Sequence, residues 1–161
     1  LVNNAGIALG EFFAPNASTV SQDVLRRTFD VNFFAVIELT QILLPLIRQA
    51  PAGRIVNLSS ILGSLGTHCA PDSPIAPAKE VAYNASKTAL NAYTVHLAAE
   101  LADTPIKVNS AHPGWVKTDM GGENAHIDVD TSVRGLVEQV NAYTGKGGHH
   151  FVDYKGDTIA W

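Results

Sequence analysis

The segment Arg54-Ile55-Val56-Asn57-Leu58 is a short apolar run that lies between a glycine and Ser59-Ser60. Apolar runs of this length between turn-forming residues are typical of buried strands. On its amino-terminal side, apolar residues recur close to every 3.6 positions, which predicts a long helix over 22–49. Pro45 is expected to bend the last turns of this helix, and Thr19-x-x-Gln22 is a candidate capping box at its start.

The alternation of strand and helix continues toward the carboxyl end. A loop rich in proline, glycine and serine occupies 61–80, where no regular structure is expected. Helices are predicted over 81–103 and 130–142, and strands over 106–111 and 150–154. Strands that alternate with helices form a parallel sheet covered on both faces. The predicted fold is therefore a doubly wound, Rossmann-like parallel α/β sheet.

The first residues, Leu1-Val2-Asn3-Asn4-Ala5-Gly6, pass from an apolar pair directly into a turn, as the end of a strand does. We therefore expect the sequence to begin inside the fold. Residues 1–161 would then form a single partial Rossmann-like domain, its carboxyl-terminal portion. The first strand would lie at an open edge of the sheet, and such edges pair readily with other chains. Dimerisation or poor solubility is the expected consequence.

The composition argues against several kinds of partner. The 161 residues carry 11 Lys and Arg against 15 Asp and Glu, and this net charge of −4 disfavours nucleic acid. The longest apolar run, 42–47, is much shorter than the roughly 18 residues of a membrane span. A single cysteine, Cys69, forms no internal disulfide, which favours a cytoplasmic protein. No metal site is predicted, because the histidines lack ligand spacing and the adjacent His149 and His150 would point to opposite faces of a strand.

Tyr83 and Lys87 stand four positions apart in the helix predicted over 81–103, so they share one face of it. A phenol ordinarily has a pKa of about 10, and a nearby ammonium favours the phenolate and would lower that pKa. The pair therefore predicts a group that transfers protons near neutral pH. Ser60 ends a strand, at the sheet edge where ligands bind, and Asn32 is expected to face inward.

These residues belong to motifs in which the chain resembles the short-chain dehydrogenase/reductase family, in its carbonyl-reductase and C-factor-like branch. The motifs occur in the family's order over nearly the whole chain: Asn3-Asn4-Ala5-Gly6, Asp30-Val31-Asn32, Ile55-Val56-Asn57-Leu58-Ser59-Ser60, Tyr83-x-x-x-Lys87, Val108-Asn109 continuing to Thr118, and the endings His112 to Gly122 and Asp153 to Trp161. The resemblance implies an oxidoreductase that transfers a hydride between NAD or NADP and a small carbonyl or alcohol substrate.

The resemblance also implies a role for each site residue. Tyr83 would be the general acid or base, and Lys87 would lower its pKa and hold the nicotinamide ribose. Ser60 would hydrogen-bond the substrate carbonyl, and Asn32 would position a water that relays protons to Lys87. The remaining cofactor contacts would come from two loops: Asn4, Ala5 and Gly6 at the adenosine side, and Pro113, Gly114, Val116 and Thr118 at the carboxamide and phosphates. A homo-oligomer through the two long helices is implied as well.

Two departures from the family pattern leave alternatives open. No glycines stand at positions i, i+4 and i+6, so the TGxxxGxG phosphate turn and the residue that selects NAD or NADP are missing. Three strand–helix units of about 30 residues each, roughly 90 in all, would carry them. The gap from Ser60 to Tyr83 exceeds the family's usual spacing, which leaves Ser59 or Ser64 as alternatives to Ser60. The alternative function is a truncated, non-catalytic relative that acts in binding or in C-factor-like signalling.

Overall fold

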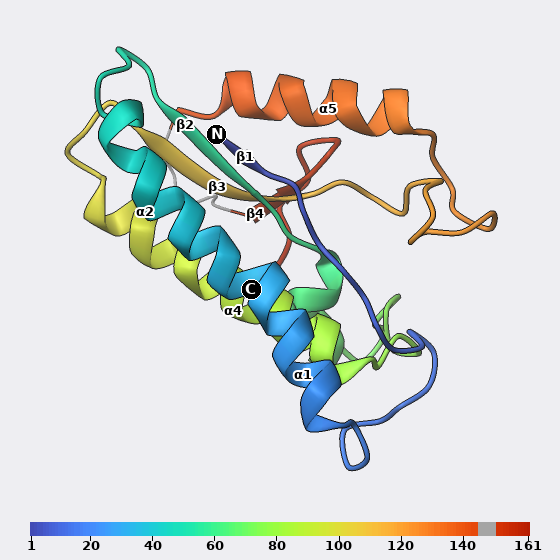
Figure 1. Ribbon diagram of the computed structural model, residues 1–161. Coiled ribbons are helices and arrows are strands. Elements are labelled where there is room, and N and C mark those ends of the chain that lie inside the picture. Colours follow the sequence, from blue (N-terminus) through green and yellow to red (C-terminus); the bar gives the residue numbers. More distant parts are fainter. Residues whose placement is uncertain (145–150) are drawn as a thin grey trace.

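The computed structural model describes residues 1–144 and 151–161 (Figure 1). Within these residues the sheet has four parallel strands, β1 to β4, in that spatial order. The strands are Val2–Asn3, Arg54–Leu58, Lys107–His112 and Phe151–Asp153. The predicted parallel α/β sheet is confirmed, and β1 lies at its edge as expected. The predicted start of the last strand at His150 lies outside the described residues.

The first long helix is confirmed over residues 22–47, but it contains an unexpected irregularity. Helix α1 (Gln22–Phe29) continues through a π-helix, η1 (Asp30–Phe34), into α2 (Ala35–Ile47). A π-helix inserts one residue into the ordinary turn and often marks a functional site. Pro45 lies near the end of α2, where the helix is about to stop.

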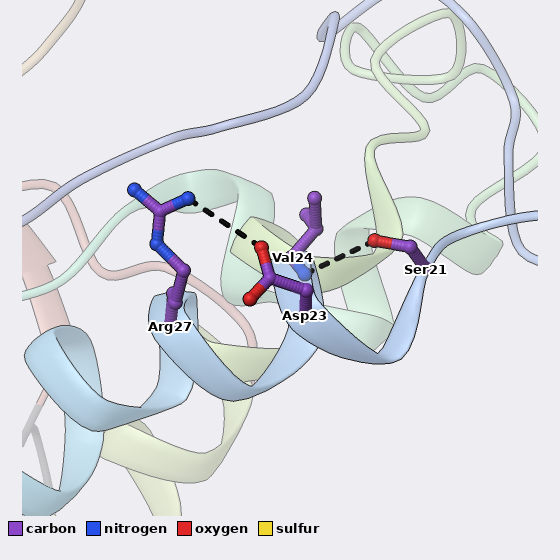
Figure 2. Close-up of polar contacts among 4 residues, drawn as sticks. All are labelled: Ser21, Asp23, Val24 and Arg27. Atoms are coloured by element: carbon purple, nitrogen blue, oxygen red, sulfur yellow. Dashed lines mark hydrogen bonds and ion pairs between the residues drawn. The ribbon is translucent and has the colours of Figure 1, made fainter.

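The capping residue of this helix is Ser21, so the predicted capping box at Thr19 is wrong. The Ser21 hydroxyl accepts a hydrogen bond from the Val24 N–H at 3.2 Å, as Figure 2 shows. Thr19 instead donates to the Asn16 carbonyl at 3.4 Å. Both side chains have the right chemistry, and the backbone conformation decides which one reaches the first free N–H groups.

The segment 61–80 is more ordered than predicted. A 3₁₀ turn, η2 (Ile61–Gly63), and a short helix, α3 (Leu65–Cys69), precede the turns that lead to α4 (Val81–Glu100). The Ser64 hydroxyl accepts from the Thr67 N–H at 3.0 Å and so caps α3. The prediction failed because proline restricts the chain only in its own neighbourhood, and all three prolines of this loop follow α3.

Helices cover both faces of the sheet, as predicted. Figure 1 shows α2 and α4 against one face and α5 (Val129–Ala142) across the other. The core on the α4 side is a cluster of fully or nearly fully buried apolar side chains: Ile55, Leu97, Leu101, Ile106 and Val108. Burial of each large side chain contributes about 1.5–3 kcal/mol.

Polar side chains continue this core toward the carboxyl ends of the strands. The Asn3 amide donates to Asn57 Oδ1 at 2.8 Å, and the Asn57 amide donates to Thr94 Oγ1 at 2.9 Å. Ser110 donates to the same Thr94 hydroxyl at 2.9 Å. Buried polar groups are costly unless they are paired, so this network ties three strands to α4 in one register.

The continuous helix Gln22–Ile47 is long and apolar enough, by length and composition, to qualify as a candidate membrane span, with a mean hydropathy of 1.6. Polar residues interrupt this helix, so its longest uninterrupted apolar run, 42–47, does not reveal the length of the apolar segment. Only 17% of this window is buried in the fold, although Asn32 and Thr40 are fully buried. The opposite side exposes large apolar side chains: Phe34, Leu39, Ile42 and Leu46.

Candidate active site

Tyr83 and Lys87 occupy the first two turns of α4, on the side that faces the sheet. Both side chains are buried, and the Lys87 Nζ lies 5.6 Å from the centre of the Tyr83 ring. The prediction that the two side chains share a face is confirmed. Because an ammonium is attracted to the face of an aromatic ring, this contact also holds the two side chains together.

Lys87 reaches across to the end of a strand. Its Nζ donates to the Leu58 carbonyl at the end of β2 at 2.7 Å. Burial lowers the pKa of Lys87 to about 8, so the ammonium still predominates at pH 7. An ammonium has three donors, and the Leu58 carbonyl uses one of them.

Burial raises the pKa of Tyr83, and a hydrogen bond with the Ser60 side chain partly offsets that rise. The prediction that Lys87 lowers this pKa is therefore wrong for the chain by itself. The ammonium lies over the ring and bonds to the Leu58 carbonyl, while the loss of water around the phenol penalises the phenolate. A phenol with a raised pKa keeps its proton until a stronger base forms beside it, which suits a general acid.

Ser60 is the serine that the structure brings to Tyr83. It is buried just after β2, and its hydroxyl accepts from the Leu62 N–H at 3.2 Å. Its hydrogen bond with the phenol is what acts against the effect of burial on the Tyr83 pKa. The Ser59 hydroxyl instead points to the Lys87 backbone carbonyl at 3.5 Å. The Ser64 hydroxyl bonds to Thr67 in the cap of α3. Of the three alternatives, Ser60 is the one whose side chain affects the pKa of the Tyr83 phenol.

Asn32 faces inward, as predicted, from the π-helix η1. Its Oδ1 accepts from the Ile7 N–H at 2.8 Å, and its Nδ2 donates to the Ile7 carbonyl at 2.9 Å and to Ser86 Oγ at 3.0 Å. Ser86 in turn donates to the Tyr83 carbonyl at 2.7 Å. Asn32 therefore joins the loop after β1 to the first turn of α4.

The loop after β1 passes close to these groups at Gly6. A Cβ at Gly6 would lie 3.5 Å from both Asn32 Oδ1 and Lys87 Nζ. The neighbouring Asn4 and Ala5 are exposed. The predicted adenosine-side residues thus lie at the carboxyl edge of the sheet, and Gly6 is adjacent to two of the four predicted catalytic side chains.

A cavity of about 460 Å³ opens beside this loop. Its walls are residues 6–12 on one side and Asp119 and Met120 on the other. The ring of Phe12 meets the Tyr83 ring edge-on, with 5.3 Å between their centres. The cavity is open to solvent, and Phe12 is the lining residue that contacts Tyr83.

The loop after β3 holds the other predicted cofactor residues. Gly114 has a φ of +83°, and a Cβ there would lie 2.5 Å from Ile127, so only glycine fits. The Pro113 carbonyl accepts from Ser132 at 2.6 Å, and Val116 forms a bridge with Ile127. Thr118 accepts from the Gly121 N–H at 3.1 Å in the turn that leads to the cavity wall.

The residues of this edge fit the nicotinamide end of a dinucleotide. Gly6 leaves the space beside Lys87 without a side chain, and Lys87 has donors beyond the one used by Leu58. The glycine-rich turn that would hold the phosphates is absent from the sequence. The residues present therefore fit the nicotinamide end of such a cofactor, and the sequence has no glycine-rich turn for its phosphates.

Residues 1–127 match the short chain dehydrogenase family. The chain belongs to this family. It is 31% identical to C-signal of Myxococcus xanthus over 166 residues, which covers 100% of this chain and 91% of C-signal. Among solved structures it superposes on the carbonyl reductase Sniffer of D. melanogaster with a TM-score of 0.83 and 36% identity, over 99% of this chain and 65% of Sniffer.

The NADPH-bound carbonyl reductase from chicken fatty liver superposes with a TM-score of 0.85 and 29% identity, over 99% of this chain and 64% of that one. This short-chain dehydrogenase therefore spans about two thirds of the length of the solved carbonyl reductases that it resembles, and nearly all of C-signal.

Two side chains of this short-chain dehydrogenase, the half-buried His112 and the buried Glu80, were not selected from the sequence. Burial lowers the pKa of His112, at the end of β3, to about 4, while Asp153 partly opposes this effect. Glu80, directly before α4, is fully buried. The signal for Glu80 was its place three residues before Tyr83, where a side chain can cap the helix. Within the described residues, which exclude His149 and His150, no three metal-ligating side chains cluster.

Proposed function

We propose that this chain is an oxidoreductase that uses NAD or NADP to interconvert a small carbonyl compound and the corresponding alcohol. The observation that carries the proposal is the arrangement of Ser60, Tyr83 and Lys87 at the carboxyl edge of the sheet, beside a cavity of about 460 Å³. A chain that only binds has no physical need for a phenol, a hydroxyl and an ammonium buried together. The proposed setting is the cytoplasm.

Tyr83 and Ser60 have different roles in the proposed reaction. In the reducing direction the cofactor, when bound, supplies a hydride to the carbonyl carbon. Tyr83 then gives its phenolic proton to the carbonyl oxygen, which completes the alcohol. Ser60 donates a hydrogen bond to the same oxygen and stabilises the negative charge that develops there. The reverse sequence, in which Tyr83 takes the proton from the alcohol, oxidises the alcohol.

The cofactor would be held by residues of both loops. Lys87 would bind the nicotinamide ribose, with Asn4, Ala5 and Gly6 at the adenosine side. Pro113, Gly114, Val116 and Thr118 would contact the carboxamide and the phosphates. Asn32 would position a water that relays protons toward Lys87. The support for NAD or NADP is the fit of the Lys87 edge, together with the NADPH bound to the similar carbonyl reductase from chicken fatty liver.

Titration of the chain with NADH and NADPH, followed by nicotinamide fluorescence, tests this function. We expect binding at micromolar concentration and consumption of the bound reductant when an aldehyde is added. Binding without turnover by a panel of aldehydes and ketones would contradict the catalytic proposal.

A second candidate, a non-catalytic protein with a signalling role, is favoured by one observation. The chain is 31% identical to C-signal and covers 91% of its length. On this alternative, neither nicotinamide cofactor binds at millimolar concentration. The fluorescence titration therefore separates the two functions.

We also propose that the chain forms a homo-oligomer through its two long helices. The supporting observation is the apolar surface of α2, where Ile42 is 65% and Leu46 62% exposed, with Val95 of α4 also exposed. Burial of such side chains against a second copy removes apolar area from water, which drives association. Sedimentation of the intact chain over a range of concentrations tests this proposal.

A further inference from the structure

Glu80 is a charged side chain in an unusual place. It is fully buried, with 0% of its surface exposed, immediately before α4. Its Oε1 accepts from the Ala82 N–H at 3.2 Å, and its Oε2 accepts from the Tyr83 N–H at 2.5 Å. Among the described residues no basic side chain forms an ion pair with it. A buried carboxylate is costly, and here the amino-terminal end of α4 is what compensates its charge.

The loop that lines the cavity packs directly on this carboxylate. A Cβ at Gly10 would lie 2.7 Å from Glu80 Oε1 and 2.8 Å from its Cγ. The Glu80 side chain cannot easily yield, because two backbone N–H groups hold its oxygens on the other side. Gly10 has no positive φ, so the close approach, and not the backbone conformation, calls for glycine there.

Two further contacts join the same loop to the same turn. Asn16 Oδ1 accepts from the Val81 N–H at 3.1 Å. The Phe12 ring packs edge-on against Tyr83. The cavity wall and the first turn of α4 therefore share a set of contacts with Glu80 at its centre. By contrast, the cap at Ser21 is exposed and contacts only its own helix (Figure 2).

We propose that Glu80 is a positioning residue, which fixes Tyr83 relative to the cavity through the Tyr83 N–H and through the loop at Gly10. The inference builds on the proposed function, because the benefit of a fixed phenol is proton transfer to a substrate in that cavity. A displacement of about 1 Å costs a reaction up to roughly 100-fold in rate.

Glu80→Gln is the principal test, because it keeps the volume but leaves one oxygen for two N–H donors. We expect kcat to fall about 10-fold, within the loss that such a displacement causes. The KM for NADPH should change less than about twofold, since the residues proposed to bind NADPH are not substituted.

Glu80→Asp, whose shorter carboxylate still caps a helix, should restore kcat to within about threefold of the wild type. The matched control Ser21→Ala removes an exposed cap and should leave kcat unchanged. Equal kcat values for Glu80→Gln and Ser21→Ala would overturn the proposal.

Substitution of Gly10 provides a second, independent test of the positioning role of Glu80. Gly10→Ala should lower kcat in the wild type but have little further effect in Glu80→Gln/Gly10→Ala, since both changes displace the same side chain. Additive losses would show that Gly10 acts by another route and would contradict the proposal.

A measurement without turnover separates this inference from the proposed function. In protein labelled with ¹³Cζ-tyrosine, the resonance assigned to Tyr83 by its loss in Tyr83→Phe should move in Glu80→Gln and remain in place in Ser21→Ala. If the wild type turns over no substrate but the resonance moves, the proposed function fails and the positioning by Glu80 stands. An unmoved resonance overturns the positioning whatever the activity.

Discussion

The two long helices of this chain distribute polar and apolar side chains in opposite ways. Helix α4 buries polar groups: Tyr83, Ser86, Lys87, Asn91 and Thr94. Helix α2 exposes large apolar side chains, among them Ile42 and Leu46. Burial of polar groups is costly without partners, whereas exposed apolar area is costly without a cover. The contrast is the one expected if α4 carries the proposed chemistry of the site and α2 the proposed association.

Ser60→Ala tests the role proposed for the groups around the start of α4. It removes the hydrogen bond to the Tyr83 phenol and the donor to the carbonyl oxygen, so kcat should fall on the order of 10²–10³-fold. The matched control is Ser59→Ala, which loses only a 3.5 Å contact with the Lys87 carbonyl. Steady-state kinetics measures kcat for both variants. Equal kcat values would contradict a role for Ser60 that Ser59 does not share.

Lys87→Met tests the cost of the buried ammonium through the pH dependence of stability. The pKa of Lys87 is about 8 in the folded chain and 10.5 when unperturbed, so the unfolded chain binds more protons between these values. The free energy of unfolding of the wild type should therefore rise with pH, by about 2 kcal/mol from pH 8 to pH 10. The variant should lack this rise.

Urea denaturation at several pH values measures this difference, with Lys155→Met, at an exposed lysine, as the control. The window ends at pH 10, because the raised pKa of Tyr83 makes the folded chain the better proton binder above that pH, which reverses the slope. If the free energy of unfolding changed with pH in the same way in the wild type and in Lys87→Met, burial of the Lys87 ammonium would not destabilise the chain.

Ile42→Glu tests the assignment of α2 to association. A charge in the middle of an apolar contact should weaken self-association at least about tenfold, or about 1.4 kcal/mol. Because Ile42 is 65% exposed, the monomer itself should keep its stability. Sedimentation equilibrium of both proteins measures the change. A wild type that is monomeric at all concentrations, or a variant that associates equally well, would contradict the role of α2.

Ser21→Ala should have the smallest effect. The loss of an exposed helix cap costs about 1 kcal/mol of the free energy of unfolding. Asp23 and Arg27, which form an ion pair at 3.5 Å on the same exposed turn, should contribute less than that (Figure 2). Urea denaturation gives the value. A change in the activity of this variant would show that α1 is coupled to the site, against the contrast drawn above.

Much of the fold could be predicted from the sequence, because it depends on periodicity. The strand Arg54–Leu58 has the predicted bounds, and α4 begins at the predicted residue. The π-helix around Asn32 was missed because one inserted residue hardly changes the apolar pattern. Helix α3 was missed because the prolines that follow it dominated the interpretation of its loop.

The geometry of the site was harder to predict from the sequence than the fold. The pairing of Tyr83 with Lys87 follows from helix spacing, but the direction of the Tyr83 pKa does not. That direction depends on whether burial or charge dominates, and burial is a property of the folded chain. Glu80 was missed because glutamate is not among the preferred helix caps. Its importance becomes apparent only when Gly10, distant in the sequence, lies against it.

The most direct test of the central claim is the rate of aldehyde reduction by wild type and Tyr83→Phe at saturating NADPH, with cofactor binding measured on the same samples. Phenylalanine keeps the ring that packs against Phe12 and Lys87 but has no proton to give. The account predicts unchanged NADPH binding and a loss of turnover on the order of 10²–10⁴-fold. Turnover by Tyr83→Phe within a few-fold of the wild type would contradict it.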